Sequence, residues 1–310
     1  MLEFDNNRKP SVPRDAATVV VVRDGECGLE VFCVRRHARS GFLGGALVFP
    51  GGKVDPLDLD PRWSERATEP HRRTREMAEG ATSALGLCVA ACREMLEEGH
   101  ILPVNPGLSA AELDLLGSRL GSASLLDLLS AEGRMLLAGD LLPFSRWVTP
   151  EAESRRFDAR FFLLALPPGQ IGRHDDRETT MSLWARPREV LEGGAEGRFF
   201  LAPPTSRTLE LLSDVGSVDE ALLLASRQSL LPICPRFVAG ENALGEPVGP
   251  PFLALPGDPR HDVRERRIDG PTRYVLRGER FVSEDAPLDE PREGLETSLP
   301  RSVEEPLGHG

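Results

Sequence analysis

The sequence predicts an α/β protein, because strand-like and helix-like runs alternate along its first third. Residues 16–23 (AATVVVVR) and 29–36 (LEVFCVRR) are short, apolar and rich in β-branched side chains, which favours buried strands. The turn sequence DGECG joins them and predicts a hairpin. Residues 84–102 (ALGLCVAACREMLEEGHIL) repeat small apolar side chains at helical spacing, which predicts a helix of about four turns or more.

The rest of the chain adds strands and helices in a less regular order. After the glutamate-rich helix, Ser109 and Glu112 form the pattern of a capping box, and a second short helix is expected at 124–131. These two helices suggest a cap or a dimer surface. The remaining predicted elements are strands at 46–49, 141–149, 156–166 and 181–185, helices at 186–191, 205–212 and 218–226, and a hairpin of 263–268 with 272–276.

Composition and charge narrow the class of protein. The 310 residues are 40% hydrophobic, which is enough for a sizeable core. A net charge of −12 argues against broad binding of nucleic acid or anionic membranes. No apolar run approaches the roughly 20 residues of a membrane span, and the first residues lack the apolar core of a secretory signal. The five cysteines show no zinc spacing. We expect a reducing, cytoplasmic environment. We also expect Cys88 and Cys92 to pack in the core.

Three carboxylates gather on one flank of the predicted helix. Glu94, Glu97 and Glu98 stand at helical positions i, i+3 and i+4, next to the apolar stripe that includes Met95. Carboxylates near a core are costly unless a positive charge meets them. Arg93 is one candidate partner and a divalent cation is the other. The alternative is that REMLEE is a solvated helix face.

A glycine-rich segment upstream favours the first interpretation. Gly51 and Gly52 follow the hydrophobic run ending at Phe49, and two adjacent glycines allow positive φ and let backbone carbonyls approach an ion. A glycine turn plus a helix ending in three glutamates resembles the signature of the Nudix hydrolases. That pattern runs Gly, five residues, Glu, seven residues, Arg-Glu, an apolar residue, any residue, Glu-Glu, any residue, Gly and an apolar residue.

The match departs from the family pattern at three places. Gly52 takes the first glycine, Asp58 replaces the first glutamate, and residues 93–98 supply the central block. His100 stands where the last glycine belongs. Residues 59–92 separate Asp58 from the block, where the pattern has only seven. This interruption resembles the Nudix subgroup that includes the peroxisomal coenzyme A diphosphatases of animals.

The resemblance implies a fold and a division of the chain. The fold would be a Nudix-type α/β/α sandwich with a mixed sheet, helical insertions and an irregular C-terminal extension. The Nudix domain would cover 14–200, with insertions at about 59–84 and 105–140. The first insertion is expected to be a charged surface excursion, either a lid or decoration. A helical and irregular extension would follow at 201–282 and a disordered tail at 283–310.

The resemblance also implies a metal site. Glu94 and Glu98 would be the principal ligands of Mg²⁺, with Mn²⁺ as the alternative ion, and Glu97 would bind a second ion. The Gly52 carbonyl would be the backbone ligand, and Arg93 would hold the glutamates in place. The general base stays open between Glu97, Glu178 and a metal-bound hydroxide. For Glu178 the favoured interpretation is a solvated acid in the loop at 170–180.

Substrate contacts are expected from Arg35, Arg36 and Gly51. The two arginines end the second strand, where they serve either solubility or phosphate binding. Phe157, Phe161 and Phe162 are expected in the core rather than in an aromatic platform.

The implied reaction is metal-dependent hydrolysis of a diphosphate in a nucleotide derivative. Coenzyme A or an acyl-coenzyme A is the leading substrate, giving 3′,5′-ADP and a phosphopantetheine. An ADP-ribose or nucleoside diphosphate sugar pyrophosphatase is one alternative. A non-catalytic nucleotide-binding Nudix module is another. The expected partner is thus a small nucleotide, with no nucleic acid or membrane, and a homodimer remains open.

Overall fold

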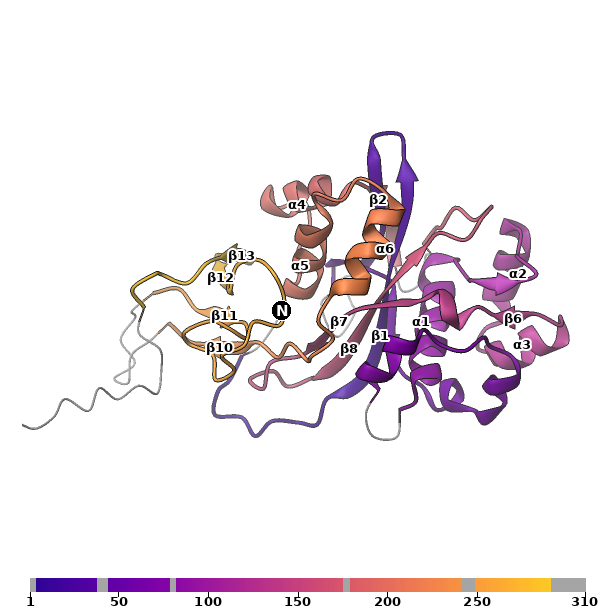
Figure 1. Cartoon of the computed structure of the whole chain (residues 1–310), viewed down its shortest axis with the longest axis horizontal. Coiled ribbons are helices and arrows are strands. Elements are labelled where there is room, and N and C mark those ends of the chain that lie inside the picture. The colour runs from indigo at the N-terminus through magenta and orange to yellow at the C-terminus, as the bar shows by residue number, and fades with distance from the viewer. Residues whose placement is uncertain (1–3, 38–43, 79–81, 175–178, 241–248, 291–310) are drawn as a thin grey trace, which may run out of the picture.

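A mixed sheet forms the centre of the molecule (Figure 1). The computed structural model describes residues 4–37, 44–78, 82–174, 179–240 and 249–290. Within them the sheet has the order β3-β2-β1-β8-β7, while β4 also pairs with β1 and β9 with β2. The β1–β8 pair is parallel and the other pairs are antiparallel, as the predicted mixed sheet requires. Its strands are β1 (Arg14–Gly25), β2 (Gly28–Arg36), β3 (Leu47–Val48), β4 (Gly51–Lys53), β7 (Leu142–Val148), β8 (Phe157–Ala165) and β9 (Thr179–Ala185).

The apolar run of β1 is continuous because both faces of the sheet are covered. Side chains alternate along a strand, so Val19 and Val21 point to one face and Val20 and Val22 to the other. All four are fully buried, in two separate apolar cores. The predicted β1–β2 hairpin is confirmed by their antiparallel register.

One helical layer consists of α1 (Ala84–Gly99), α2 (Ala110–Arg119) and α3 (Leu125–Ala131). The predicted capping box of α2 is confirmed, with Ser109 and Glu112 bonding reciprocally. The Ser83 hydroxyl caps α1 by accepting from the Gly86 N–H at 2.9 Å. The prediction that this helix reaches residue 102 is wrong. It ends at Gly99 because His100 takes a left-handed conformation with φ of 50°, which redirects the next residues into the core.

A second helical layer covers the opposite face (Figure 1) and completes the predicted α/β/α sandwich. It consists of α4 (Pro187–Ala195), α5 (Pro203–Leu212) and α6 (Val218–Arg227). Leu209 and Leu212 of α5 and Ala221 and Ala225 of α6 belong to the same buried core as Val20. Two helices assigned to a C-terminal extension are therefore part of the sandwich. None of the helices in the described ranges has the length and apolar character of a bilayer span.

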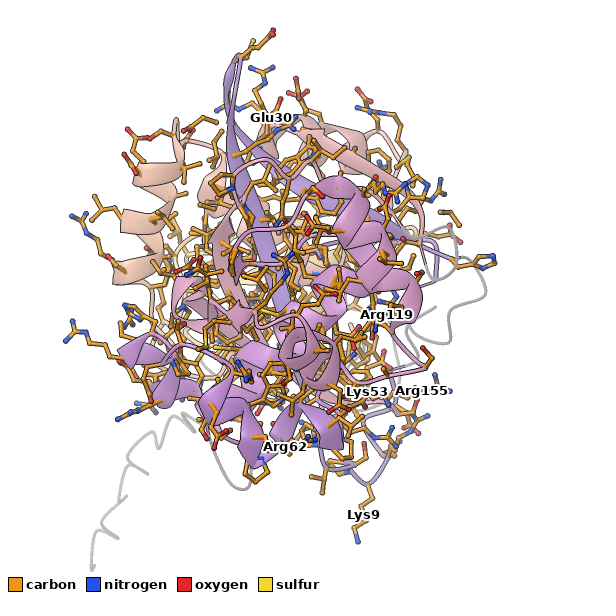
Figure 2. All side chains as sticks on the ribbon, turned by 90° about the vertical axis from the view of Figure 1, so that its right-hand side faces the viewer. Lys9, Glu30, Lys53, Arg62, Arg119 and Arg155 are labelled. Carbon is orange, nitrogen blue, oxygen red and sulfur yellow. The ribbon has the colours of Figure 1, made fainter. Side chains whose placement is uncertain are left out.

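The insertion inside the glutamate signature is more integrated than a surface excursion. It folds into the short helices η1 (Pro56–Leu59), η2 (Pro61–Glu65) and η3 (Arg72–Met77). Charged groups such as Arg62 lie on its outside (Figure 2), but Trp63 and Met77 are buried in the core around α1. The Arg73 guanidinium donates to the carbonyls of Ser226 and Gln228, each at 2.7 Å. The insertion is thereby attached to the end of α6 on the other layer.

The second insertion contains, besides α2 and α3, a small antiparallel pair and a short helix. These are β5 (Val104–Asn105), β6 (Met135–Leu136) and η4 (Ala138–Asp140). Arg119 of α2 lies on its surface (Figure 2). The expectation that this region forms a cap or a dimer surface stays a prediction.

The C-terminal region forms a small sheet of β10 (Arg236–Val238), β11 (Phe252–Ala254), β12 (Arg273–Arg277) and β13 (Arg280–Glu284). The predicted hairpin of 263–268 with 272–276 is wrong, because β12 pairs with β11 and β13. The buried Arg207 guanidinium instead holds the turn by donating to the Asp269 and Pro271 carbonyls, at 2.5 and 2.6 Å. β13 extends into the predicted tail, of which residues 291–310 lie outside the described part.

Candidate functional site

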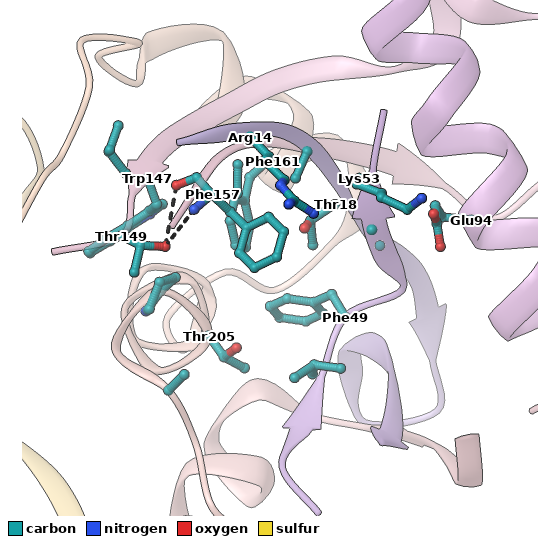
Figure 3. Close-up of a pocket in the computed structure, with 18 of the residues that line it drawn as sticks. Arg14, Thr18, Phe49, Lys53, Glu94, Trp147, Thr149, Phe157, Phe161 and Thr205 are labelled. Carbon is teal, nitrogen blue, oxygen red and sulfur yellow. Dashed lines mark hydrogen bonds between the residues drawn. The ribbon is translucent and has the colours of Figure 1, made fainter. Parts of the chain in front are cut away.

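A cleft of about 610 Å³ joins the end of α1 to a chamber between the sheet and the C-terminal region. Its charged end is formed by α1 and β4. Its other end lies on the sheet face that carries even-numbered side chains of β1. In Figure 3 the labelled residues run from Glu94, past Lys53, Thr18 and Arg14, to the aromatic residues.

The three predicted glutamates all line the charged end. Glu98 is only 1% exposed and Glu94 is 8% exposed, so both carboxylates are largely withdrawn from water. Glu98 accepts from the Gly51 N–H at 3.0 Å and from Arg36 at 3.3 Å. The Glu97 side chain is more accessible, at 37%. The carboxylates therefore face a cleft and are not a solvated helix face.

Arg93 connects the parts of the interrupted signature. Its guanidinium donates to both oxygens of Asp58 at 2.9 Å, to Glu94 at 2.9 Å and to Glu97 at 3.1 Å. It also donates to the Lys53 carbonyl at 3.0 Å, which fixes β4 to α1. Burial alone would lower the pKa of Arg93, but Asp58 and the two glutamates raise it, so the side chain stays charged. The geometry matches the positioning role expected for Arg93.

The two glycines differ from the prediction of a turn with positive φ. Gly51 and Gly52 lie in β4 and pair with Thr18 and Ala17 of β1. Neither has positive φ. A Cβ on Gly52 would overlap the Glu94 carboxylate, and one on Gly51 would lie 2.6 Å from the Ala17 carbonyl oxygen. A Cβ on Gly51 would have no room against the β1 backbone, and one on Gly52 would displace the Glu94 carboxylate. The two glycines therefore allow β4 to lie next to Glu94.

Of the two arginines that were expected to contact the substrate, only Arg36 lines the cleft. Arg36 lines the cleft and bonds Glu98, and its buried Nε has no hydrogen-bond partner among the described residues. Arg35 does not line the cleft, and its Nε donates to the Gly45 carbonyl at 3.3 Å. The register of β2 against β9 shifts between these two arginines. The structure does not bring Arg35 together with the glutamates. Glu178 lies outside the described residues.

The chamber is what the sequence analysis did not find. One face of β8 supplies Phe157, Ala159 and Phe161, and these pair in register with Arg14, Ala16 and Thr18 of β1. Phe162, on the other face, is a core residue as expected. The period-two alternation of β8 could have indicated two different roles for these aromatic residues. The other chamber residues come from distant segments and include Phe4, Phe49, Trp147, Thr149, Pro203, Thr205, Pro235 and Leu253.

The donor set of the charged end suits a hard divalent cation. Within the described ranges, no three His, Cys, Asp or Glu side chains are gathered in a way that could hold a metal ion. Mg²⁺ does not need such a cage, because it usually takes one or two carboxylates and completes its shell with water and substrate phosphates. The buried carboxylates of Glu94 and Glu98, with the Gly52 backbone next to Glu94, provide a partial site of this kind.

Comparisons with known proteins point to one family. No family model matches the chain. It is 28% identical over 254 residues to an acyl-coenzyme A diphosphatase, NUDT19 of Gallus gallus, covering 66% of this chain and 67% of that protein. It is 23% identical over 273 residues to putative nudix hydrolase 7 of Caenorhabditis elegans, covering 84% and 79%. Among solved structures, a NUDIX hydrolase from Alicyclobacillus acidocaldarius is 32% identical with a TM-score of 0.56, covering 69% of this chain and 96% of that one.

Proposed function

This chain belongs to the Nudix hydrolases, and we propose that it cleaves the diphosphate linkage of coenzyme A or an acyl-coenzyme A. The products would be 3′,5′-ADP and a phosphopantetheine or its acyl ester. The observation that carries the proposal is the shape and lining of the cleft, which joins a carboxylate cluster to an apolar chamber. An acyl-coenzyme A has the same division, with a diphosphate in the middle and an apolar arm at one end. The similarity to an acyl-coenzyme A diphosphatase supports the same choice.

The chamber fits a pantetheine arm in a further respect. Trp147 is 3% exposed, and its indole N–H has no hydrogen-bond partner among the described residues. A buried donor without a partner costs free energy, about 1–3 kcal/mol. A carbonyl of an amide-containing arm in the chamber is a partner that would remove this cost. A sugar bearing several hydroxyls would gain less from the surrounding phenylalanine and proline side chains.

Nudix hydrolases generally use divalent metals, and here Glu94, Glu98 and Glu97 with the Gly52 carbonyl would hold them. We assign Mg²⁺ first and Mn²⁺ second, since both take oxygen ligands. When bound, such ions neutralise the charge that develops on the phosphate oxygens and the leaving group.

The chain's own residues position the reactants. Arg93 orients Glu94 and Glu97 through hydrogen bonds at 2.9 and 3.1 Å. A water molecule attacks phosphorus and the bridging P–O bond breaks. Each product keeps one phosphate of the original diphosphate, and 3′,5′-ADP also keeps its 3′-phosphate. Glu97 is our first choice to take the proton of that water, because its accessible carboxylate lines the cleft, while Glu178 stays the alternative. Arg36 would bind phosphate oxygens through its Nε.

A reducing compartment such as the cytoplasm suits the cysteines, since all five lie in the described part and are free thiols. Cys88 and Cys92 pack in the core as expected, and burial raises the pKa of Cys88 to about 12.

A substrate panel tests the function. Purified protein with Mg²⁺ is given coenzyme A, palmitoyl-coenzyme A, ADP-ribose and a nucleoside triphosphate in parallel, and kcat/KM is measured for each. The proposal expects the two coenzyme A compounds to be preferred by tenfold or more. A preference for ADP-ribose would instead support the alternative function, an ADP-ribose pyrophosphatase. Binding without turnover of any compound would favour the non-catalytic module.

A further inference from the structure

The Arg14 side chain is a cation of the cleft that sequence analysis did not single out. Four cationic side chains of the described part of the chain line the cleft. Arg36 bonds Glu98 at 3.3 Å, Lys53 pairs with Asp55 at 2.8 Å, and Arg93 bonds three carboxylates. Within the described residues, the Arg14 guanidinium has neither a hydrogen-bond partner nor an ion-pair partner. An acidic protein that leaves one arginine uncompensated in its cleft has a group available for an anionic ligand.

The strand register fixes where this cation lies. Arg14, Ala16 and Thr18 share one face of β1, and all three line the cleft. Gly52, beside the glutamates, pairs with Ala17. Three residues of a strand span about 10 Å. The backbone of Arg14 therefore lies about 10 Å along β1 from Ala17, the residue that pairs with Gly52 at the charged end. On its other side Arg14 pairs with Phe157 of the chamber. Figure 3 shows Arg14 in this intermediate position, between Phe157 and Lys53.

We propose that Arg14 binds a phosphate group of the substrate and thereby helps to set specificity. This inference rests on the proposed coenzyme A function. A guanidinium is a planar donor fork that matches two phosphate oxygens, and it stays charged at all working pH values. Coenzyme A offers two sources of phosphate oxygens, the central diphosphate and the 3′-phosphate of its ribose. The position of Arg14, between the charged end and the chamber, allows it to reach either group in a bent substrate.

The test compares Arg14→Met with wild type on coenzyme A and on 3′-dephospho-coenzyme A. Arg14→Lys keeps the charge but loses the fork, and Arg188→Met is the matched control. Arg188 is exposed on α4, pairs with Asp214 at 3.1 Å and does not line the cleft. Because Arg14 is exposed, Arg14→Met should fold normally, which a thermal midpoint within about 2 °C of wild type would verify.

We expect Arg14→Met to reduce kcat/KM by about 10- to 100-fold, mainly through KM, with partial rescue in Arg14→Lys. An equal loss on both substrates assigns Arg14 to the diphosphate, and a loss confined to coenzyme A assigns it to the 3′-phosphate. Unchanged kinetics on both substrates would overturn the inference.

A binding measurement separates this inference from the proposed function. Calorimetry with ADP and with 3′,5′-ADP needs no turnover, so it reports on Arg14 even if wild type cleaves neither coenzyme A compound. A weaker affinity of Arg14→Met for at least one nucleotide supports the phosphate contact. Equal affinities of variant and wild type for both nucleotides reject it.

Discussion

At the scale of single residues, Glu98 is the carboxylate on which the proposed metal site depends most. It is buried between the Gly51 N–H and Arg36 and lines the cleft. Glu98→Gln keeps an oxygen for Gly51 but removes the charge that a divalent ion requires. Loss of one preorganised electrostatic group typically costs about 10²–10³ in kcat. We therefore expect a loss of that size, and a smaller rise of the thermal midpoint on adding Mg²⁺.

Turnover and thermal midpoints with and without Mg²⁺ check this expectation. Glu65→Gln, in η2 and away from the cleft, is the surface control. Normal turnover and an unchanged Mg²⁺ response in Glu98→Gln would show that this carboxylate does not serve the metal.

Gly52 tests whether the close approach of β4 to α1 matters for activity. In Gly52→Ala the new methyl group overlaps the Glu94 carboxylate, which is the end of a flexible side chain. The side chain can move, so we expect a folded protein with kcat reduced by about 10²-fold, as for a displaced charged group. Gly107→Ala is the matched control, since a Cβ there meets no atom within 4 Å. Equal activity of the two variants would contradict the role of Gly52.

Arg36 and Arg35 form a natural pair for comparison. Arg36 lines the cleft with a buried Nε that has no hydrogen-bond partner among the described residues, whereas Arg35 bonds a carbonyl outside the cleft. Arg36→Ala should raise KM about tenfold or more, because a hydrogen bond to a charged group contributes about 1.5–3 kcal/mol. Arg35→Ala should leave KM within about twofold. Steady-state kinetics with coenzyme A measure both KM values. A larger rise in KM for Arg35→Ala than for Arg36→Ala would indicate that Arg36 serves only solubility.

Residue-level features were predictable where they depend on local spacing. The three glutamates and Arg93 follow from helical periodicity, so their convergence could be expected from the sequence. The reason for glycine at position 52 could not be predicted. A Cβ there would clash with Glu94 on α1, which lies more than 30 residues away along the chain. The left-handed His100 explains why the family pattern has glycine at that position, since glycine adopts positive φ without steric cost.

At the scale of elements, the sheet and α1 were predictable, whereas the C-terminal sheet was not. Strands β1, β2, β7 and β8 carry strong apolar patterns of their own. The pairing of β12 is instead set by non-local contacts such as those of Arg207, which no local pattern reports. For the same reason the chamber was missed, because its walls come from strands and from segments beyond residue 200.

Phe157, at the start of β8, tests what occupies the chamber. Its ring is half-buried and lines the apolar end of the cleft. Removing it should weaken binding of a long acyl arm by about 1–2 kcal/mol, the value of a partly buried large side chain. Both substrates would place the pantetheine arm in the chamber, but only palmitoyl-coenzyme A adds an acyl chain. KM for palmitoyl-coenzyme A should therefore rise about tenfold in Phe157→Ala, and KM for free coenzyme A should rise less. Equal changes for both substrates would place the acyl arm outside the chamber.

At the scale of the whole molecule, the C-terminal region and the Nudix signature build one cleft together. Helices α5 and α6 complete the sandwich, and β11 places Leu253 against the chamber. The insertion at 59–84 supports the core through Trp63 and Met77, and none of its described residues lines the cleft. In the proposed function the glutamates would hold the metal ions, and the C-terminal region would shape the space for the substrate.

The bond that the protein cuts distinguishes a diphosphatase from a thioesterase, and the masses of the products identify that bond. Palmitoyl-coenzyme A is incubated with the protein and Mg²⁺, and the reaction is analysed by mass spectrometry. We predict 3′,5′-ADP and palmitoyl-phosphopantetheine with its thioester intact, formed only when a divalent metal is present. Free palmitate with intact coenzyme A, or unchanged substrate under conditions in which the protein binds it, would contradict the account.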